Sequence, residues 1–165
     1  MALRNIRVED DPILKEVSRP VKEITPRVKV LLEDMIDTMD EAEGVGLAAP
    51  QVGILKRIVV IRIGKDLYQM INPEIIAQNG SQIDAEGCLS VPGKRGIVER
   101  PMEVTVRYMD ENGNMQEKTG QGLLARAFCH EIDHLDGHLY TRLVEEYLAD
   151  NEFYDPETDE IYIEE

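Results

Sequence analysis

All three histidines of this chain lie within nine residues, at positions 130, 134 and 138, and the spacing of the first two suits a helix. Residues 130–134 read His-Glu-Ile-Asp-His, and a spacing of four residues puts two side chains on nearly one face of an α-helix. His130 and His134 can therefore bind one metal ion. Glu131, turned by about 100°, can reach a water held by that ion rather than the ion itself. This motif predicts a late metal-binding helix.

Apolar residues at helical spacing define two helices. The later one covers residues 123–136 and is expected to stop at Gly137, a typical residue at a helix C-terminus. The earlier one is expected to begin at Thr25, an N-cap followed by Pro26, and to continue towards Gly44.

The chain between these helices predicts two hairpins. Residues 58–63 pair with 67–71, and Asn-Pro at 72–73 is expected to end the second strand. Residues 103–109 pair with a return strand from Met115 through an Asn-Gly turn. Helix, strands and helix in this order are typical of an α+β fold, with antiparallel strands packed around the late helix. We expect a single domain over residues 1–165, with an acidic tail from about 145.

A catalytic metal site of this kind needs a third protein ligand and an open position. The longer HExxHxxGxxH motif of some zinc peptidases would put a histidine at position 140, which is Tyr140. His138 follows the helix end, and Cys129 is turned about 100° from the first motif histidine, so both are poor ligands. This leaves Cys88, in Glu-Gly-Cys-Leu-Ser-Val-Pro at 86–92, which taken alone could equally be a small buried apolar residue.

A third segment, residues 44–53, reads Gly-Val-Gly-Leu-Ala-Ala-Pro-Gln-Val-Gly. It imitates a dinucleotide-binding fingerprint, but it follows a helix and meets Pro50 instead of opening a helix after a strand. Glycines beside small residues suit a loop whose backbone lines a site, and Gln51 offers an amide donor.

In this order, GVGLAAPQVG at 44–53, EGCLSVP at 86–92 and HEIDHLDG at 130–137 resemble the three signature motifs of the bacterial peptide deformylase family. The resemblance extends to about residue 144. It implies a metal-dependent hydrolase that removes the N-formyl group from the N-terminal formyl-methionine of nascent polypeptides, by attack of a metal-held water.

The resemblance also implies a role for particular residues. The metal ligands would be Cys88, His130 and His134. Glu131 would be the general acid/base, and Gln51 and the backbone N–H of Leu89 would stabilise the oxyanion. The residues that would bind substrate are Val45, Gly46 and Gly87 through their backbone and Leu123 as a wall of the methionine pocket. Arg126 departs from the pattern, because some relatives are expected to carry an apolar residue there.

A thiolate ligand such as Cys88 suits Fe²⁺ as well as Zn²⁺. The resemblance implies one divalent metal ion, with Fe²⁺ as the native ion and Zn²⁺, Ni²⁺ or Co²⁺ able to replace it.

Composition limits the partners of this chain. It has 33 acidic and 18 basic residues, a net charge of −15, which disfavours binding to nucleic acid or an anionic membrane. Two cysteines and a charged N-terminus without a signal-like segment favour the reducing cytoplasm.

The C-terminal segment 145–165 carries ten acidic residues and no basic one. We expect it to be solvated and partly ordered by its apolar residues, the alternative being a docking tail for a basic partner. Some family members end in a basic helix thought to dock on the ribosome. This chain lacks such a helix, so any ribosome contact is expected to be transient.

Two other functions stay open from the sequence. An HExxH zinc metallopeptidase could take a downstream carboxylate such as Glu152 as third ligand, and Cys88→Ala would then keep the metal. A non-enzymatic metal-stabilised binding module would keep its function in Glu131→Ala. A further interpretation is that the histidines only complement the dipole at the helix C-terminus.

Overall fold

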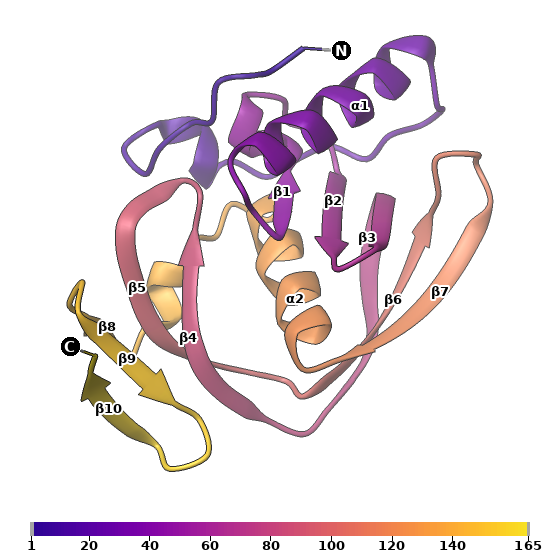
Figure 1. Cartoon of the computed structure of the whole chain (residues 1–165). Coiled ribbons are helices and arrows are strands. Elements are labelled where there is room, and N and C mark those ends of the chain that lie inside the picture. Colours follow the sequence, from indigo (N-terminus) through magenta and orange to yellow (C-terminus); the bar gives the residue numbers. More distant parts are fainter. Residues whose placement is uncertain (1, 165) are drawn as a thin grey trace.

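The computed structural model describes residues 2–164, and helix α2 (Leu123–Leu135) lies at its centre (Figure 1). One side of α2 packs on a five-stranded antiparallel sheet of order β1-β2-β3-β6-β7. Its strands are β1 (Gly46–Ala48), β2 (Ile58–Ile63), β3 (Asp66–Asn79), β6 (Glu103–Met109) and β7 (Met115–Gln121).

A second sheet of three antiparallel strands, in the order β4-β5-β8, flanks the same helix (Figure 1). Its strands are β4 (Gln82–Cys88), β5 (Val91–Arg100) and β8 (Glu146–Leu148). Short 3-10 helices cover Pro12–Lys15 (η1), Ala49–Val52 (η2) and Tyr140–Leu143 (η3). The α+β fold with antiparallel strands around the late helix is confirmed.

Helix α1 (Pro26–Glu41) begins as predicted, because the Thr25 hydroxyl accepts a hydrogen bond of 3.3 Å from the backbone N–H of Val28. Its apolar face, which includes Met35 and Met39, packs with the apolar residues of β2 into one core. Leu47 of β1 and Ala49 and Val52 of η2 belong to the same core, so this layer supports both short elements.

Helix α2 has two different faces. Phe128, Ile132 and Leu135 pack with strands of the large sheet in a second apolar core, whereas the two histidines lie elsewhere on the helix. The helix ends before Gly137, which has φ of +80°. A Cβ at Gly137 would lie 2.5 Å from the backbone oxygen of Lys15, so this turn requires glycine.

The prediction that Asn72-Pro73 ends a strand is wrong, since β3 continues to Asn79. The register of β3 against β6 shifts between Ile71 and Glu74, and Asn72 has φ of 53°. The Asn72 side chain forms two hydrogen bonds of 2.8 Å with the backbone of Val21. A bulge therefore accommodates proline within the sheet, and a side chain supplies the hydrogen bonds to the neighbouring segment.

The acidic C-terminal segment is folded. After β8, the strands β9 (Glu152–Asp155) and β10 (Glu160–Ile163) form a hairpin beside the small sheet (Figure 1). Leu148 and Tyr154 are buried with Ile97 of β5, while Tyr162 and Ile163 are exposed. Within residues 2–164, no helix is long and apolar enough to cross a membrane.

Candidate active site

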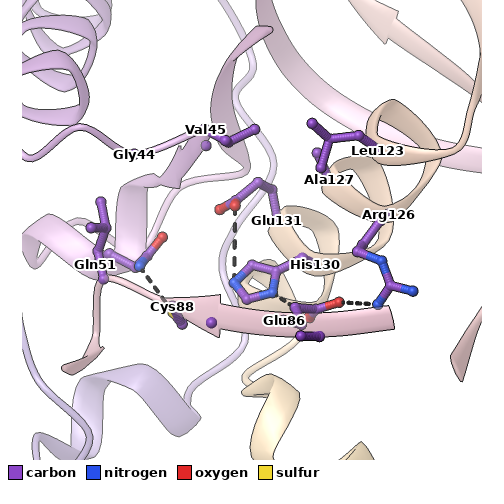
Figure 2. A pocket seen from close by; sticks show the side chains of 14 residues that line it. Gly44, Val45, Gln51, Glu86, Cys88, Leu123, Arg126, Ala127, His130 and Glu131 are labelled. Carbon is purple, nitrogen blue, oxygen red and sulfur yellow. Dashed lines mark hydrogen bonds and ion pairs between the residues drawn. The ribbon is translucent and has the colours of Figure 1, made fainter. Parts of the chain in front are cut away.

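A cavity of about 340 Å³ opens between the two sheets and α2. Figure 2 shows its lining, which comes from the loop before β1, from η2, from the end of β4 and from α2. The lining residues are Gly44, Val45, Gly46, Gln51, Ala85, Glu86, Gly87, Cys88, Leu89, Leu123, Arg126, Ala127, His130 and Glu131. The three motifs singled out in the sequence thus meet at one cavity.

Three side-chain atoms of kinds that can bind a metal ion converge beside this cavity. His134 Nε2 lies 3.4 Å from Cys88 Sγ and 3.3 Å from His130 Nε2, and all three atoms lie within 4.8 Å of one another. Tetrahedral ligation with Zn–N of about 2.0 Å and Zn–S of about 2.3 Å separates ligand atoms by about 3.3–3.6 Å. These side chains therefore fit a single divalent ion.

Glu86, two residues before Cys88 on β4, orients His130. Its Oε2 lies 2.6 Å from His130 Nδ1, which leaves Nε2 of that ring to face the other two donor atoms. Burial opposes ionisation of Glu86, but hydrogen bonds from His130 and Arg100 hold its pKa well below the usual range. Sequence reasoning assigned no role to Glu86. Its place two residues before Cys88 on the same strand was the available signal.

Glu131 lies beside the donor atoms without being one of them. Its Oε2 is 4.0 Å from His130 Nε2, and within residues 2–164 its Oε1 is buried without a hydrogen-bond partner. Burial raises the pKa of Glu131 to about 7. A carboxyl group with such a pKa can accept and release a proton near neutral pH.

The surroundings shift the pKa values of the two imidazoles in opposite directions. Burial opposes protonation of His130, but Glu131, Cys88 and Glu86 raise its pKa well above the usual value. Burial and the neighbouring His130 lower the pKa of His134 well below its usual value. His134 is thus neutral, which is the form that binds metals.

Gln51 is held rigidly next to Cys88. Its Oε1 accepts a hydrogen bond of 2.9 Å from the Ala48 N–H. Its Nε2 donates to Ser90 Oγ at 3.0 Å and lies 3.6 Å from Cys88 Sγ. This amide therefore has a fixed orientation at the edge of the cavity.

The structure also brings the other predicted residues to the cavity. Gly46, Gly87 and Leu89 line it, as do Val45 and Leu123, whose side chains are exposed at its mouth. The alternative third ligand, Glu152, lies in the C-terminal segment, where its carboxylate accepts a hydrogen bond of 2.7 Å from the Ala149 N–H. It does not belong to the cluster of three donor residues.

Comparison with known proteins gives consistent results. A family model described as polypeptide deformylase matches residues 3–148. Peptide deformylase from Agathobacter rectalis is 61% identical over 150 residues, covering 91% of this chain and 95% of the relative. The peptide deformylase from Alkaliphilus metalliredigens is 59% identical over 141 residues, covering 86% of this chain and 96% of the relative.

Solved structures agree with the sequence matches. The peptide deformylase from Legionella pneumophila has a TM-score of 0.85 and 42% identity, covering 87% of each chain. The enzyme from Thermotoga maritima has a TM-score of 0.85 and 38% identity, covering 88% of this chain and 99% of that one. The family match ends at β8, so the β9–β10 hairpin lies beyond it.

Proposed function

The chain belongs to the polypeptide deformylase family, whose members are metal-dependent hydrolases that remove the N-formyl group of nascent polypeptides, and from this premise we propose the role of each residue. The observation that carries the proposal is the convergence of one thiol and two imidazoles beside a buried carboxyl group.

Cys88, His130 and His134 would hold the divalent ion. When bound, such an ion acts as a Lewis acid and lowers the pKa of water from 15.7 to about 7. We propose Fe²⁺ as the native ion, as the resemblance to the family implies, with Zn²⁺, Ni²⁺ or Co²⁺ as functional substitutes; a thiolate ligand accepts both Fe²⁺ and Zn²⁺.

Glu131 is the proposed general acid/base. It accepts the proton of the attacking water and delivers it to the amine that leaves when the formyl C–N bond breaks. A pKa of about 7 supports both steps, since either protonation state is accessible at neutral pH.

Gln51 and the backbone N–H of Leu89 are the proposed donors to the oxyanion. The Gln51 amide has two N–H groups, of which one donates to Ser90 and the other is directed at Cys88 Sγ, 3.6 Å away. The bond of Oε1 to Ala48 holds the amide in this orientation, beside the proposed metal ligands. Loss of one such donor typically raises the barrier by about 3 kcal/mol.

The substrate peptide would bind between two strand edges. β1 and β4 are the first strands in the orders of their sheets, and the cavity lies between them. An extended peptide can pair with such edges through its backbone, here with Val45, Gly46 and Gly87. The methionine side chain would then pack against Leu123 and Ala127.

The proposed setting is the bacterial cytoplasm, with formyl-methionyl nascent chains as substrate. We propose that any contact with the ribosome is transient; the segment after β8 forms an acidic hairpin. We treat residues 1–165 as one catalytic domain with this acidic extension.

The test is release of free amine from a formyl-methionyl peptide, with metal content measured on the same sample. We expect Glu131→Ala to keep its metal and lose turnover by a factor of about 10² or more. Cys88→Ser should bind metal more weakly and lose most activity. A Cys88→Ala variant with wild-type metal content, or cleavage of internal peptide bonds, would instead favour the zinc metallopeptidase.

A further inference from the structure

Arg126 lies in the cavity wall, but its charged end points away from the cavity into a buried ion-pair cluster. We propose that Arg126 is a positioning residue: acting through Glu86, it fixes His130 and holds strand β4 at the distance from α2 that brings Cys88 to the histidines. This role rests on the proposed function, because it concerns the same metal ligands.

The first step of the argument is the path from Arg126 to His130. Arg126 precedes His130 by four residues on α2, so both side chains leave the helix on nearly one face. Arg126 Nη1 lies 2.8 Å from Glu86 Oε1, and His130 Nδ1 lies 2.6 Å from Glu86 Oε2. One carboxylate thus bridges the arginine and the metal-binding histidine (Figure 2).

The second step is that Arg126 supplies the shorter of the two arginine bonds to Glu86 Oε1. Arg100 Nη2 binds Oε2 at 2.7 Å, but its Nε reaches Oε1 only at 3.2 Å. Arg100 is also shared with Asp133, to which its Nη1 donates at 2.8 Å. Without Arg126, Oε1 would keep only the 3.2 Å bond from Arg100, a cation that is also paired with Asp133.

The third step concerns the spacing of α2 and the small sheet. Arg126 Nη1 also donates to the backbone oxygen of Val98 on β5 at 3.1 Å. Arg126 therefore ties α2 to β5 through Val98 and to β4 through Glu86. Glu86 lies two residues before Cys88 on β4. Since Cys88 Sγ lies only 3.4 Å from His134 Nε2, a small shift of β4 would separate the ligands.

A role confined to the cavity wall would not require a guanidinium group. Arg126 is 5% exposed, and in the described chain its Nη2 is buried without a hydrogen-bond partner. Burying an incompletely paired cation is unfavourable, whereas methionine would supply the same apolar surface to the cavity. The ion pair with Glu86 and the bond to Val98 are the contacts that methionine cannot make.

The experiment measures Co²⁺ affinity by competition with a chelator, and the Co²⁺ absorption spectrum, for Arg126→Met, Glu86→Gln and the double variant. Arg107→Met is the matched control, because Arg107 forms an exposed ion pair with Glu117 on the far strands. We expect Arg126→Met to weaken Co²⁺ binding by about 10–100-fold and to shift the spectrum, as loss of groups that orient ligands does. The control should match wild type.

The double variant tests the path through Glu86. In the Glu86→Gln background, Arg126→Met should weaken Co²⁺ binding by less than about 3-fold, because the bridging carboxylate is already gone. An equal loss in both backgrounds would overturn the proposal. If Glu86→Gln does not fold, Arg126→Lys decides: affinity between wild type and Arg126→Met supports the role, and affinity no better than Arg126→Met overturns it.

Kinetics separate positioning from substrate contact. Arg126→Met should lower kcat for a formyl-methionyl peptide while KM stays within about 2-fold. A rise in KM alone, with unchanged Co²⁺ affinity and spectrum, would make Arg126 a wall residue and overturn the proposal. If the wild-type protein bound no Co²⁺, the proposed function and this role would both be overturned. If wild type and Arg126→Met bound Co²⁺ with equal affinity, only this role would be overturned.

Discussion

The carboxylate of Glu131 lies directly against the backbone of Gly46: a Cβ added at Gly46 would stand 2.5 Å from Glu131 Oε2. Gly46 begins β1, and Glu131 lies in the second half of α2. The absence of a side chain at Gly46 therefore sets where the proposed acid/base can sit relative to the donor atoms on the same helix.

We expect Gly46→Ala to lower kcat by about 10-fold or more while metal content stays at the wild-type value. The added Cβ must displace the Glu131 carboxylate, and proton transfer depends on hydrogen-bond distance to the reacting group. The three atoms nearest to the added methyl group all belong to Glu131. None of them belongs to the proposed metal ligands Cys88, His130 and His134. Steady-state kinetics and metal analysis of the purified variant provide the measurement.

Gly120→Ala is the matched control, because its Cβ would lie 2.6 Å from the Leu124 side chain, outside the cavity lining. This variant should lose stability but keep kcat at a temperature where it is folded. Equal turnover of Gly46→Ala and wild type would show that Glu131 can move without consequence.

The spacing of His130 and His134 was sufficient to predict that both imidazoles lie close together on one helix, because helix geometry relates residues four apart. Helix geometry alone left Cys88 as one candidate for the third metal ligand. Only the order of the three motifs along the chain assigned that role to it. The ion pair between Glu86 and Arg126 was not predicted from the sequence. It joins β4 to α2 across 40 residues, and no local periodicity of the sequence encodes such a pairing.

The same limit applies to the strands. Residues 58–63 and 103–109 alternate or cluster apolar residues and were predicted with the observed bounds. β5 contains Pro92, two glycines and several charged residues, so its pattern does not indicate a strand, although it pairs with both β4 and β8. Here tertiary pairing overrides weak local preference.

The two cysteines should differ in their reaction with a thiol reagent after metal removal. Burial raises the pKa of Cys129 to about 11, so its reactive thiolate is scarce near neutral pH. Cys88 is half-buried at the cavity and should be alkylated first. Peptide mass spectrometry of chelator-treated protein measures both rates.

Metal should then protect Cys88 selectively. Reloading the chelator-treated protein with Zn²⁺ before alkylation should slow labelling of Cys88 and leave that of Cys129 unchanged. Unprotected Cys88 in fully loaded protein would argue against its role as a ligand.

We expect the C-terminal hairpin to stabilise the fold without contributing to catalysis. The Arg95 guanidinium lies 5.2 Å from the centre of the Phe153 ring and donates to the backbone oxygens of Ala149 and Glu152. Tyr154 is buried against the small sheet, yet no residue beyond 131 lines the cavity of the described chain. A chain ending after Leu148 should unfold at a lower temperature and keep kcat within about 2-fold.

Phe153→Ala separates the two contributions of the hairpin. It removes the cation–π contact with Arg95, typically worth about 0.5–1 kcal/mol, together with the stacking of Phe153 on Tyr162, while the rest of the segment stays. Its melting temperature should lie between those of the full chain and the truncated chain. A truncated chain that is folded but inactive would show that the hairpin helps to build the site.

Asp110 predicts how stability depends on pH in the turn between β6 and β7. The Asn114 N–H, the Gln116 side chain and the Asn112 N–H all donate to its carboxylate, and together they lower its pKa. A carboxyl group whose pKa is lower in the folded state stabilises that state above its unfolded pKa, about 3.9, and loses this effect as pH falls through the folded value. Urea unfolding should therefore give wild type a larger free energy of unfolding than Asp110→Asn at pH 7, and this gap should narrow only below about pH 4.

Glu111→Gln is the control, because Glu111 is a neighbouring acid for which the described chain shows no side-chain hydrogen bond. Its free energy of unfolding should show no such gap from wild type. A gap that stays constant down to pH 3, or that widens with acid, would mean that the ionised carboxylate of Asp110 does not stabilise this turn.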